Sequence, residues 1–216
     1  MAEETLGIEE RLAKLEEKVA SHKHADAGVP IANPAPLGLF AFGLTTLMLN
    51  LVNAELVEKN TTSLVLGYGM FYGGLCQIFA GLWEFRKNNT FGATAFTSYG
   101  AFWMGLAFWH LLADADIWNP SSSFKGGFAS ILAVWGMFTG LMFVATLKIN
   151  RALQMVFLTL TILFFLLAAG QYNPDVHRIA GYEGILCAFT AIYAAWAQVI
   201  NEVWGKVVLP LGPVKK

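Results

Sequence analysis

Long apolar segments, separated by short polar ones, run through most of the chain. Each is about 19 to 26 residues long, which fits a hydrocarbon core that needs about 20 residues of helix. Lipid offers the backbone no hydrogen-bond partners, so each segment is expected to be a helix. The pattern predicts an all-α integral membrane protein with six transmembrane helices, at approximately residues 36–56, 63–85, 91–112, 127–147, 152–170 and 179–204.

The residues before the first segment follow a different pattern. Apolar side chains recur there with spacings of four, three and four, at Ile8, Leu12, Leu15 and Val19. This is a narrow heptad-like stripe, and Glu10 and Lys14 add a favourable pair four residues apart. Residues 5–24 are therefore predicted to form an amphipathic soluble helix. This helix lies either on the surface of its own protein or against another copy of the chain.

The distribution of Lys and Arg predicts how the chain crosses the membrane. If the N-terminus is cytoplasmic, eleven of these residues lie on the inner side, and three lie on the outer side, at Lys59, Lys125 and Arg178. Positive residues favour the cytoplasmic side, so both termini of this multi-pass protein are expected there, at the plasma membrane. The chain then divides into an N-terminal tail, a six-helix membrane domain and a C-terminal tail, at residues 1–31, 32–206 and 207–216.

Composition agrees with a membrane protein and excludes other classes. Hydrophobic residues make up 56% of the chain and charged residues 13%, against about 25% charged in an ordinary soluble domain. The formal net charge of −1 provides no basic face for nucleic acid. The sequence contains no evident nucleophile–base pair, metal cluster or phosphate-binding loop, so we expect neither an enzyme nor a bound cofactor or metal.

The first apolar segment begins with ANPAPLGLFAFG, at residues 32–43. Pro34 and Pro36 suit the first helical turn, where a missing N–H costs nothing, and Asn33 is a good N-cap. The positive end of this helix dipole would lie near the cytoplasmic face and favour anions. Asn-Pro-Ala also occurs in water channels, which use two copies in half-helices that meet at mid-membrane. This chain has one copy, at a helix start, so we set a water channel aside.

Polar side chains inside the apolar segments follow helical spacing. Residues spaced by four, four and three share one face of the first segment, at Phe42, Thr46, Asn50 and Asn53. Gln77 and Glu84 are seven residues apart and share a face of the second segment. Such groups either hydrogen-bond neighbouring helices or line a pore. Charged residues are almost absent from the middle of the segments, so no relay of Asp, Glu or His through the centre is evident.

One motif, NPAPLGL, is more specific than these patterns. It comprises Asn33, Pro34, Ala35, Pro36, Leu37, Gly38 and Leu39. Through it the chain resembles the acetate uptake transporter family, also called the succinate–acetate permease or GPR/FUN/YaaH group. The resemblance continues through FGLTTLMLNLVN, GYGMFYGGLCQIFAGLWEF, NTFGATAFTSYGAFW, LQMVFLTLTILFFLLA, HRIAGYEGILCAFTAIY and VVLPLG, and covers about residues 32–212.

The resemblance implies six membrane spans per subunit, a homohexameric ring and a separate path through each subunit. It also implies transport of acetate, and in some members of succinate or other short carboxylates. Family members narrow the path with three side chains, which by matching motifs fall on Phe42, Tyr99 and Leu160. Ala191 matches a small residue near the path, where side-chain size influences which acids pass.

A ring of Phe, Tyr and Leu would be apolar with one hydroxyl, so it would block a hydrated ion and pass a partly dehydrated carboxylate. Donors for that carboxylate are expected among five residues that could equally have packing roles, at Thr46, Asn50, Gln77, Thr97 and Thr161. Glu183 is a candidate coupling carboxylate or an entry-side residue. His177 is a candidate sensor of external pH or a partner in a helix-start hydrogen bond, since histidine titrates near neutral pH.

Moving an anion inward against a negative-inside potential costs about 2.3 kcal/mol per 100 mV. Accumulation therefore needs a co-transported cation, most simply a proton, which the acid itself could carry. Three functions stay open: a proton-coupled acetate transporter, a passive acetate or small-anion channel with the same path, and a sensor that binds acetate and signals through the N-terminal helix. The expected partners are the carboxylate, protons, the lipid bilayer and further copies of this chain.

Overall fold

The computed structural model describes residue 7 and residues 10–18, 31–118 and 124–214. The chain forms two compact units, residues 1–32 and residues 33–216. In the first unit, residues 10–18 are helical, and the predicted pair is present, with Lys14 Nζ 2.9 Å from Glu10 Oε1. The Leu12 and Leu15 side chains are exposed. The other two residues of the predicted stripe, Ile8 and Val19, lie outside the described residues.

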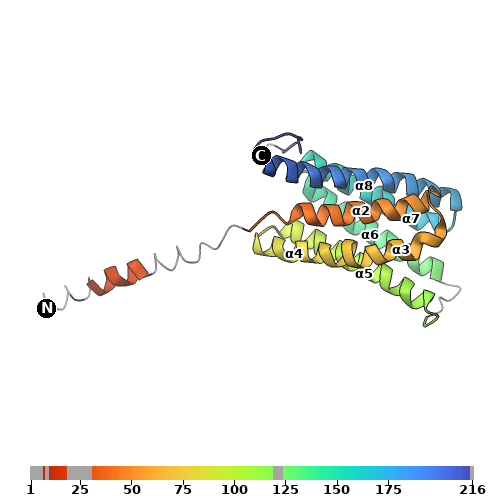
Figure 1. Cartoon of the computed structure of the whole chain (residues 1–216), viewed down its shortest axis with the longest axis horizontal. Helices are drawn as coiled ribbons and strands as arrows, with labels where there is room; N and C mark the ends of the chain where they lie inside the picture. The colour runs from red at the N-terminus through yellow and green to blue at the C-terminus, as the bar shows by residue number, and fades with distance from the viewer. Residues whose placement is uncertain (1–6, 8–9, 19–30, 119–123, 215–216) are drawn as a thin grey trace. The chain divides into compact units, whose positions relative to one another are not determined.

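The second unit is a bundle of helices that run alongside one another (Figure 1). Each predicted apolar segment coincides with a helical stretch, and α3, η2 and α4 follow one another without a break to form the second. The elements are α2 (Ala35–Asn53), η1 (Lys59–Thr61), α3 (Thr62–Tyr68), η2 (Gly69–Cys76), α4 (Gln77–Arg86), α5 (Thr90–Asp114), α6 (Phe124–Thr146), α7 (Arg151–Gly170) and α8 (Pro174–Val203).

Asparagine side chains set where three of these helices begin. Asn89, Asn150 and Asn173 accept hydrogen bonds from backbone N–H groups in the first turns of α5, α7 and α8. Such N-caps satisfy donors that the helix itself leaves unpaired. Pro174 follows Asn173 at the first helical position, so α8 begins five residues before the predicted start at residue 179. Residues 174–178, which were expected to lie between two segments, are therefore part of the helix, while residues 171–173 remain outside it.

Five of the helical stretches in the described part of the chain are long and apolar enough to cross a membrane. They are Ala35–Asn53, Lys59–Arg86, Phe124–Thr146, Arg151–Gly170 and Pro174–Val203. The third predicted segment, α5, is 25 residues long but is not among them. Its sequence includes Thr, Ser, Tyr and His side chains, which lower its hydropathy. The prediction of a sixth transmembrane helix therefore rests on the length and position of α5.

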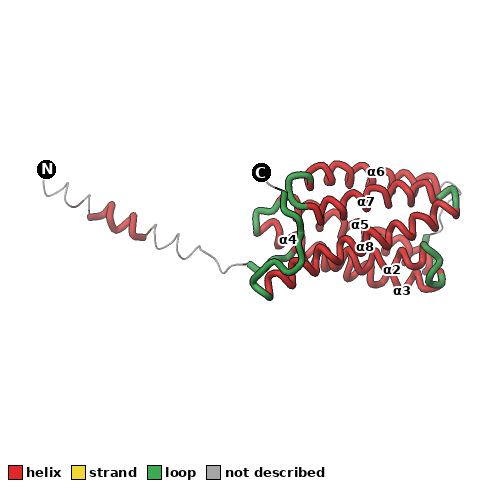
Figure 2. The backbone as a smooth tube through the Cα atoms, turned by 90° about the horizontal axis from the view of Figure 1, so that it is seen from above, coloured by secondary structure: helices red, strands yellow, loops and turns green. Residues whose placement is uncertain are grey.

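The helices pack in an order that differs from their order along the chain. α2 lies against α8, α8 against α7 and α7 against α6, while α5 lies against η2 and α4 (Figure 2). The main core cluster includes residues from α2, α5, α7 and α8. Helices from early and late in the second unit therefore share one core. This packing brings the NPAPLGL motif near residues more than 150 positions away, as the hydrogen bond between Asn33 and Gln198 shows.

The described part of the second unit contains one π-helical stretch, η2. Two of its glycines, Gly69 and Gly73, lie against the Trp103 ring of α5, where an added Cβ would come within 2.9 and 3.0 Å of ring carbons. The wide π-helical turn of η2 and the absence of side chains at these two glycines let α5 approach η2 closely. Trp103 is 3% exposed and lines the interior of the bundle.

The residues after α8 turn back and are tied to the bundle. The Arg151 N–H donates to Gly212 O at 2.8 Å, and the Val214 N–H donates to Ile149 O at 3.1 Å. Asn201 Oδ1 accepts from the N–H groups of Val208 at 2.7 Å and Leu209 at 2.9 Å. The described part of the predicted C-terminal tail therefore packs beside the turn between α6 and α7, at the end of the bundle where α2 begins (Figure 1).

Candidate functional site

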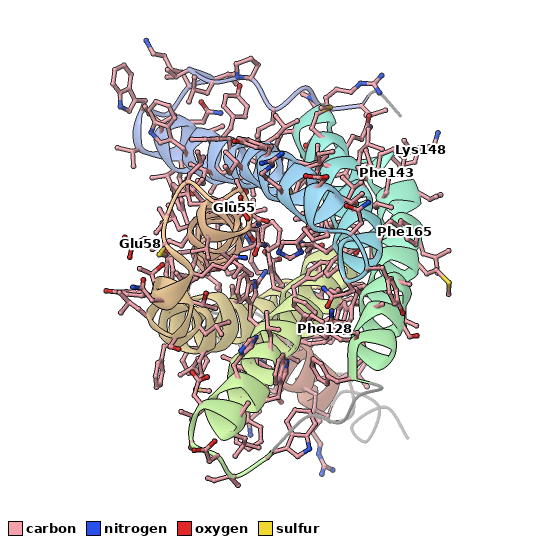
Figure 3. All side chains as sticks on the ribbon, turned by 90° about the vertical axis from the view of Figure 1, so that its right-hand side faces the viewer. Glu55, Glu58, Phe128, Phe143, Lys148 and Phe165 are labelled. Carbon is pink, nitrogen blue, oxygen red and sulfur yellow. The ribbon has the colours of Figure 1, made fainter. Side chains whose placement is uncertain are left out.

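Two cavities lie inside the bundle. Cavity 1, of about 250 Å³, lies at the end where α2 begins, and cavity 2, of about 240 Å³, lies toward the other end. Of all the described residues that line them, three line both cavities: Phe42 of α2, Tyr99 of α5 and Leu160 of α7. These three side chains therefore separate the two spaces. Figure 3 looks along the bundle at the cavity 2 end. It labels Phe128, which lines cavity 2, and also Glu55 and Glu58, which follow α2.

The separating residues are buried and aromatic-rich. Phe42 is 6% exposed, and Tyr99 and Leu160 are each 3% exposed. The ring centroids of Phe42 and Tyr99 lie 6.1 Å apart. The Tyr99 hydroxyl donates to Thr139 Oγ1 at 2.9 Å, and that hydroxyl donates in turn to Trp135 O at 2.7 Å. The three side chains expected at the constriction thus border both cavities, and the one hydroxyl among them donates to α6.

One face of α2 connects the two cavities. Ala35 and Leu39 line cavity 1, Phe42 lines both, and the polar residues further along line cavity 2, namely Thr46, Asn50 and Asn53. The predicted shared face of this helix is confirmed. Helical spacing alone is enough to bring these side chains to the centre of the bundle.

Cavity 2 contains a small amide network with one free hydroxyl. Asn50 Nδ2 donates to Thr46 O at 2.8 Å, and Asn53 Nδ2 donates to Asn50 Oδ1 at 3.1 Å. The buried Thr46 Oγ1 has no hydrogen-bond partner among the described residues. His110, Gln171 and His177 line the same cavity. This cavity can therefore offer a solute hydroxyl and imidazole groups.

Cavity 1 combines buried acceptors with one positive charge. Gln77 and Glu84 of α4 both line it, which confirms that they share a face, and each is 1% exposed. Asn89 Nδ2 donates to Glu84 Oε2 at 2.8 Å. Lys87 also lines the cavity, and its Nζ donates to Asn33 Oδ1 at 3.4 Å.

The start of α2 differs by one residue from the prediction. The N-cap is Pro34, Pro36 occupies an early helical position, and the expected cap Asn33 instead connects two helices. Asn33 Nδ2 donates to Gln198 Oε1 of α8 at 2.9 Å, and Asn33 Oδ1 accepts from the Ala35 N–H at 3.3 Å. Proline at the cap leaves Asn33 outside the helix, where its side chain reaches α8.

The motif residues divide into two groups. Asn33, Ala35 and Leu39 line cavity 1. The remaining members line neither cavity, and they are Pro34, Pro36, Leu37 and Gly38. A Cβ at Gly38 would lie 2.6 Å from the Phe96 ring, so that residue keeps α2 close to α5. The motif therefore shapes the cavity 1 end of the bundle through both lining and packing.

Four other predicted residues line neither cavity. Thr97 Oγ1 donates to Ala93 O at 2.7 Å, and Thr161 Oγ1 donates to Phe157 O at 2.7 Å, so both hydroxyls are used within their own helices. Ala191 is fully buried in the core. Both carboxyl oxygens of Glu183 are buried without a partner among the described residues, outside both cavities.

Sequence reasoning missed several residues that line cavity 1. They come from turns, from α8 and from the C-terminal segment, and include Lys87, Asn89, Asn150, Gln198 and Leu211. The position of Lys87 one helical turn after Glu84 was the available signal for that residue. No spacing rule links Leu211 to α2, because the contact depends on the path of the tail.

Comparisons with known proteins agree with one another. The model of the GPR1/FUN34/yaaH family matches residues 16–215. The succinate-acetate/proton symporter SatP of Escherichia coli (strain K12) is 48% identical over 185 residues, which cover 84% of this chain and 96% of that protein. Acetate permease A of Emericella nidulans is 36% identical over 195 residues, covering 83% of this chain and 65% of that protein. A structure of the bacterial acetate channel SatP superposes with a TM-score of 0.80 at 46% identity, covering 85% of this chain and all of that one.

Proposed function

The chain belongs to the GPR1/FUN34/yaaH family, and we propose that it carries acetate across the plasma membrane through a path formed by cavities 1 and 2. The observation that supports this most is that the two cavities meet at Phe42, Tyr99 and Leu160. Two aligned spaces with a narrow apolar junction are what a selective pore for a small solute requires. Transport by this chain requires no enzymatic step, and its relatives are named as transporters or channels.

The chemistry of the path suits a short carboxylate. Phe42 and Leu160 offer apolar contacts to a methyl group, while Thr46 and Asn50 on one side and Gln77 on the other offer polar contacts. Thr97, Thr161 and Ala191 line neither cavity, so in this scheme they act as positioning residues through the packing of their helices. Short acids fit the path best, and succinate or other larger carboxylates depend on how far the junction can open.

The membrane arrangement is part of the same proposal. At 1.5 Å per residue, the 25 residues of α5 extend about 38 Å, which exceeds a hydrocarbon core of about 30 Å. Its polar Tyr99 and His110 side chains line the cavities, so a lower hydropathy is compatible with a sixth transmembrane helix. We propose that both terminal tails are cytoplasmic, that cavity 1 opens on that side of the membrane, and that six copies form a ring.

Proton-coupled transport and passive flow through a channel make different predictions. Relatives are named in both ways, as a proton symporter and as an acetate channel. Glu183 and His177 remain candidate proton-handling residues, and His177 lines cavity 2. Coupled transport would let an inward proton gradient raise internal acetate above its equilibrium concentration, while a channel would only equilibrate it.

Labelled acetate uptake into liposomes that contain the purified full chain tests the proposal. The membrane potential is clamped, and uptake by protein-free liposomes is subtracted because acetic acid crosses lipid unaided. Saturable uptake that excess acetate blocks is the expected result. Saturable binding without flux would instead indicate a sensor, and would contradict transport. Accumulation beyond equilibrium under a proton gradient distinguishes the coupled transporter from the channel.

A further inference from the structure

Two buried oxygen atoms that line cavity 1 lack donors. Gln77 Oε1 and Glu84 Oε1 have no hydrogen-bond partner among the described residues, and both side chains are 1% exposed. Both line the cavity from α4, seven residues and about 10.5 Å apart. Buried acceptors are almost always paired, so an occupant of this cavity that brings a donor is favoured.

The two acceptors lie at different depths along the cavity. Gly100 follows Tyr99 on α5, and a Cβ added there would contact Ile78, which follows Gln77 on α4. A Cβ added at Gly92, near the start of α5, would lie 3.0 Å from Glu84 Cδ. α4 and α5 therefore run in opposite directions, with Gln77 level with Tyr99 and Glu84 level with the start of α5. A solute that has crossed the junction would meet Gln77 first and Glu84 afterwards.

Around Glu84, one carboxyl oxygen is available to an occupant of the cavity, and one positively charged side chain lines the same cavity. Asn89 donates to Oε2, so Oε1 is the atom available to an occupant. Apart from Glu84, the titratable residues that line cavity 1 are Lys87 and Tyr99, and the Tyr99 hydroxyl donates to Thr139. The residues that α2, α7, α8 and the tail contribute to this cavity are uncharged. Lys87 is thus the positive charge in a cavity that otherwise holds one carboxyl group.

We propose, on the premise that the chain transports acetate, that Glu84 is one half of a proton-sharing carboxylic-acid site in cavity 1. A short carboxylic acid bound at Glu84 Oε1 and the Glu84 carboxyl group hold one proton between them. Two carboxylates within hydrogen-bond distance are not both ionised, because like charges repel in a site shielded from water. The pair takes up its proton as a unit, whichever oxygen carries it.

The proton balance of binding follows from this geometry. An acetate anion from neutral solution, an ionised Glu84 and one proton from water combine, and one O–H bond forms on one of the two carboxyl groups. Release toward the cytoplasm breaks that O–H bond and returns the proton to water, while Lys87 offsets the negative charge of the pair. Gln77 Oε1 accepts the O–H of the neutral acid on its way from the junction.

Glu183 is the competing carboxyl group. Its two oxygens also lack partners among the described residues, but it lines neither cavity. A solute in cavity 1 therefore reaches Glu84 and does not reach Glu183. Cavity 2 supplies His110 and His177 in place of a carboxyl group. The proton-sharing site is thus specific to cavity 1.

Proton uptake on acetate binding tests the site. The full chain in lipid nanodiscs is mixed with saturating acetate in lightly buffered solution at about pH 7, with a pH indicator. We expect the unmodified chain to take up one more proton per copy than Glu84→Gln. The glutamine amide can donate a hydrogen bond to the acetate anion, so no proton is taken up from solution. Glu202→Gln, at the exposed end of α8, serves as the surface control. Both Glu202→Gln and Glu183→Gln are expected to take up as many protons as the unmodified chain.

Equal proton uptake by Glu84→Gln and the unmodified chain would overturn the proposal, and so would a loss of uptake in Glu183→Gln. If Glu84→Gln fails to assemble, infrared difference spectra of the unmodified chain with ordinary and ¹³C-labelled acetate give a second test. A protonated carboxyl band that Glu183→Gln retains supports the site whether or not the label shifts it, and the absence of such a band overturns the site. Flux of labelled acetate on the same samples is a separate readout, so a failure of transport is distinguishable from a failure of the Glu84 site.

Discussion

The hydroxyl of Tyr99 is 2.9 Å from Thr139 Oγ1, to which it donates its hydrogen bond. The junction between the two cavities therefore presents Phe42, Leu160 and the aromatic face of Tyr99 to a solute. A carboxylate at that point exchanges water for apolar contacts, which is unfavourable for an isolated charge. A neutral acid loses less on the same step, which agrees with the proton-sharing site proposed in cavity 1.

Removing the Tyr99 hydroxyl is expected to have a small effect on transport. Because that hydroxyl points to α6, Tyr99→Phe should keep acetate flux within about twofold of the unmodified chain, while the lost hydrogen bond costs about 1 kcal/mol of stability. Liposome flux and thermal unfolding of the purified protein measure the two effects. A fall in flux of more than tenfold, with folding retained, would mean that the hydroxyl contacts the solute directly.

The size of the junction is expected to set which acids pass. Leu160→Ala removes a side chain that lines both cavities, and Ala191→Gly loosens the packing of α8 nearby, so both should raise the flux of lactate and succinate relative to acetate. Leu160→Ala should also destabilise the protein, by about 2–5 kcal/mol if the space does not collapse. Competition between labelled acetate and each larger acid gives the preference. An unchanged preference in both variants would rule out this junction as the selectivity filter.

Small residues on α8 are expected to let it approach α2 closely. A Cβ at Gly181 would run into the backbone of Asn53 and Ala54, whereas a Cβ at Gly184 would meet the Asn50 side chain. Gly181→Ala should therefore destabilise the protein more than Gly184→Ala, because backbone moves less readily than a side chain. Gly67→Ala is the control, since nothing lies within 4 Å of its added Cβ, and alanine should favour the helix by about 0.5–1 kcal/mol.

Thermal unfolding of the three glycine variants in one detergent gives their order of stability. Gly184→Ala has a second expected effect, because a displaced Asn50 would enter cavity 2 and lower acetate flux. A Gly181→Ala protein as stable as Gly67→Ala would show that α2 and α8 are not held as closely as described.

The sequence predicted much of this molecule for physical reasons. Apolar length located all six helical stretches, since a membrane requires helices of about 20 residues. Helical spacing placed Phe42, Thr46, Asn50 and Asn53 on one face, and the structure confirms it. These predictions depend on local geometry, which a short stretch of chain determines by itself.

Other features depended on contacts between distant segments and escaped prediction. Thr97 and Thr161 have the same residue type as Thr46, but they lie against Gly81 of α4 and Gly140 of α6 and line neither cavity. The direction of the Tyr99 hydroxyl depends on Thr139, forty residues later in the chain. The start of α8 was placed too late, because the polar residues around Asn173 were assigned to a loop when they are in fact a cap and a first turn.

The measurement that tests the path most directly is acetate flux through Leu160→Trp in liposomes. The larger ring would fill the junction that Leu160 shares with Phe42 and Tyr99, so flux should fall to the level of protein-free liposomes. Leu141→Trp on α6 is the matched control, because the Leu141 side chain is 74% exposed and lines neither cavity, and it should keep flux within about twofold of the unmodified chain. Flux through a correctly assembled Leu160→Trp protein at the unmodified rate would contradict a path through this junction.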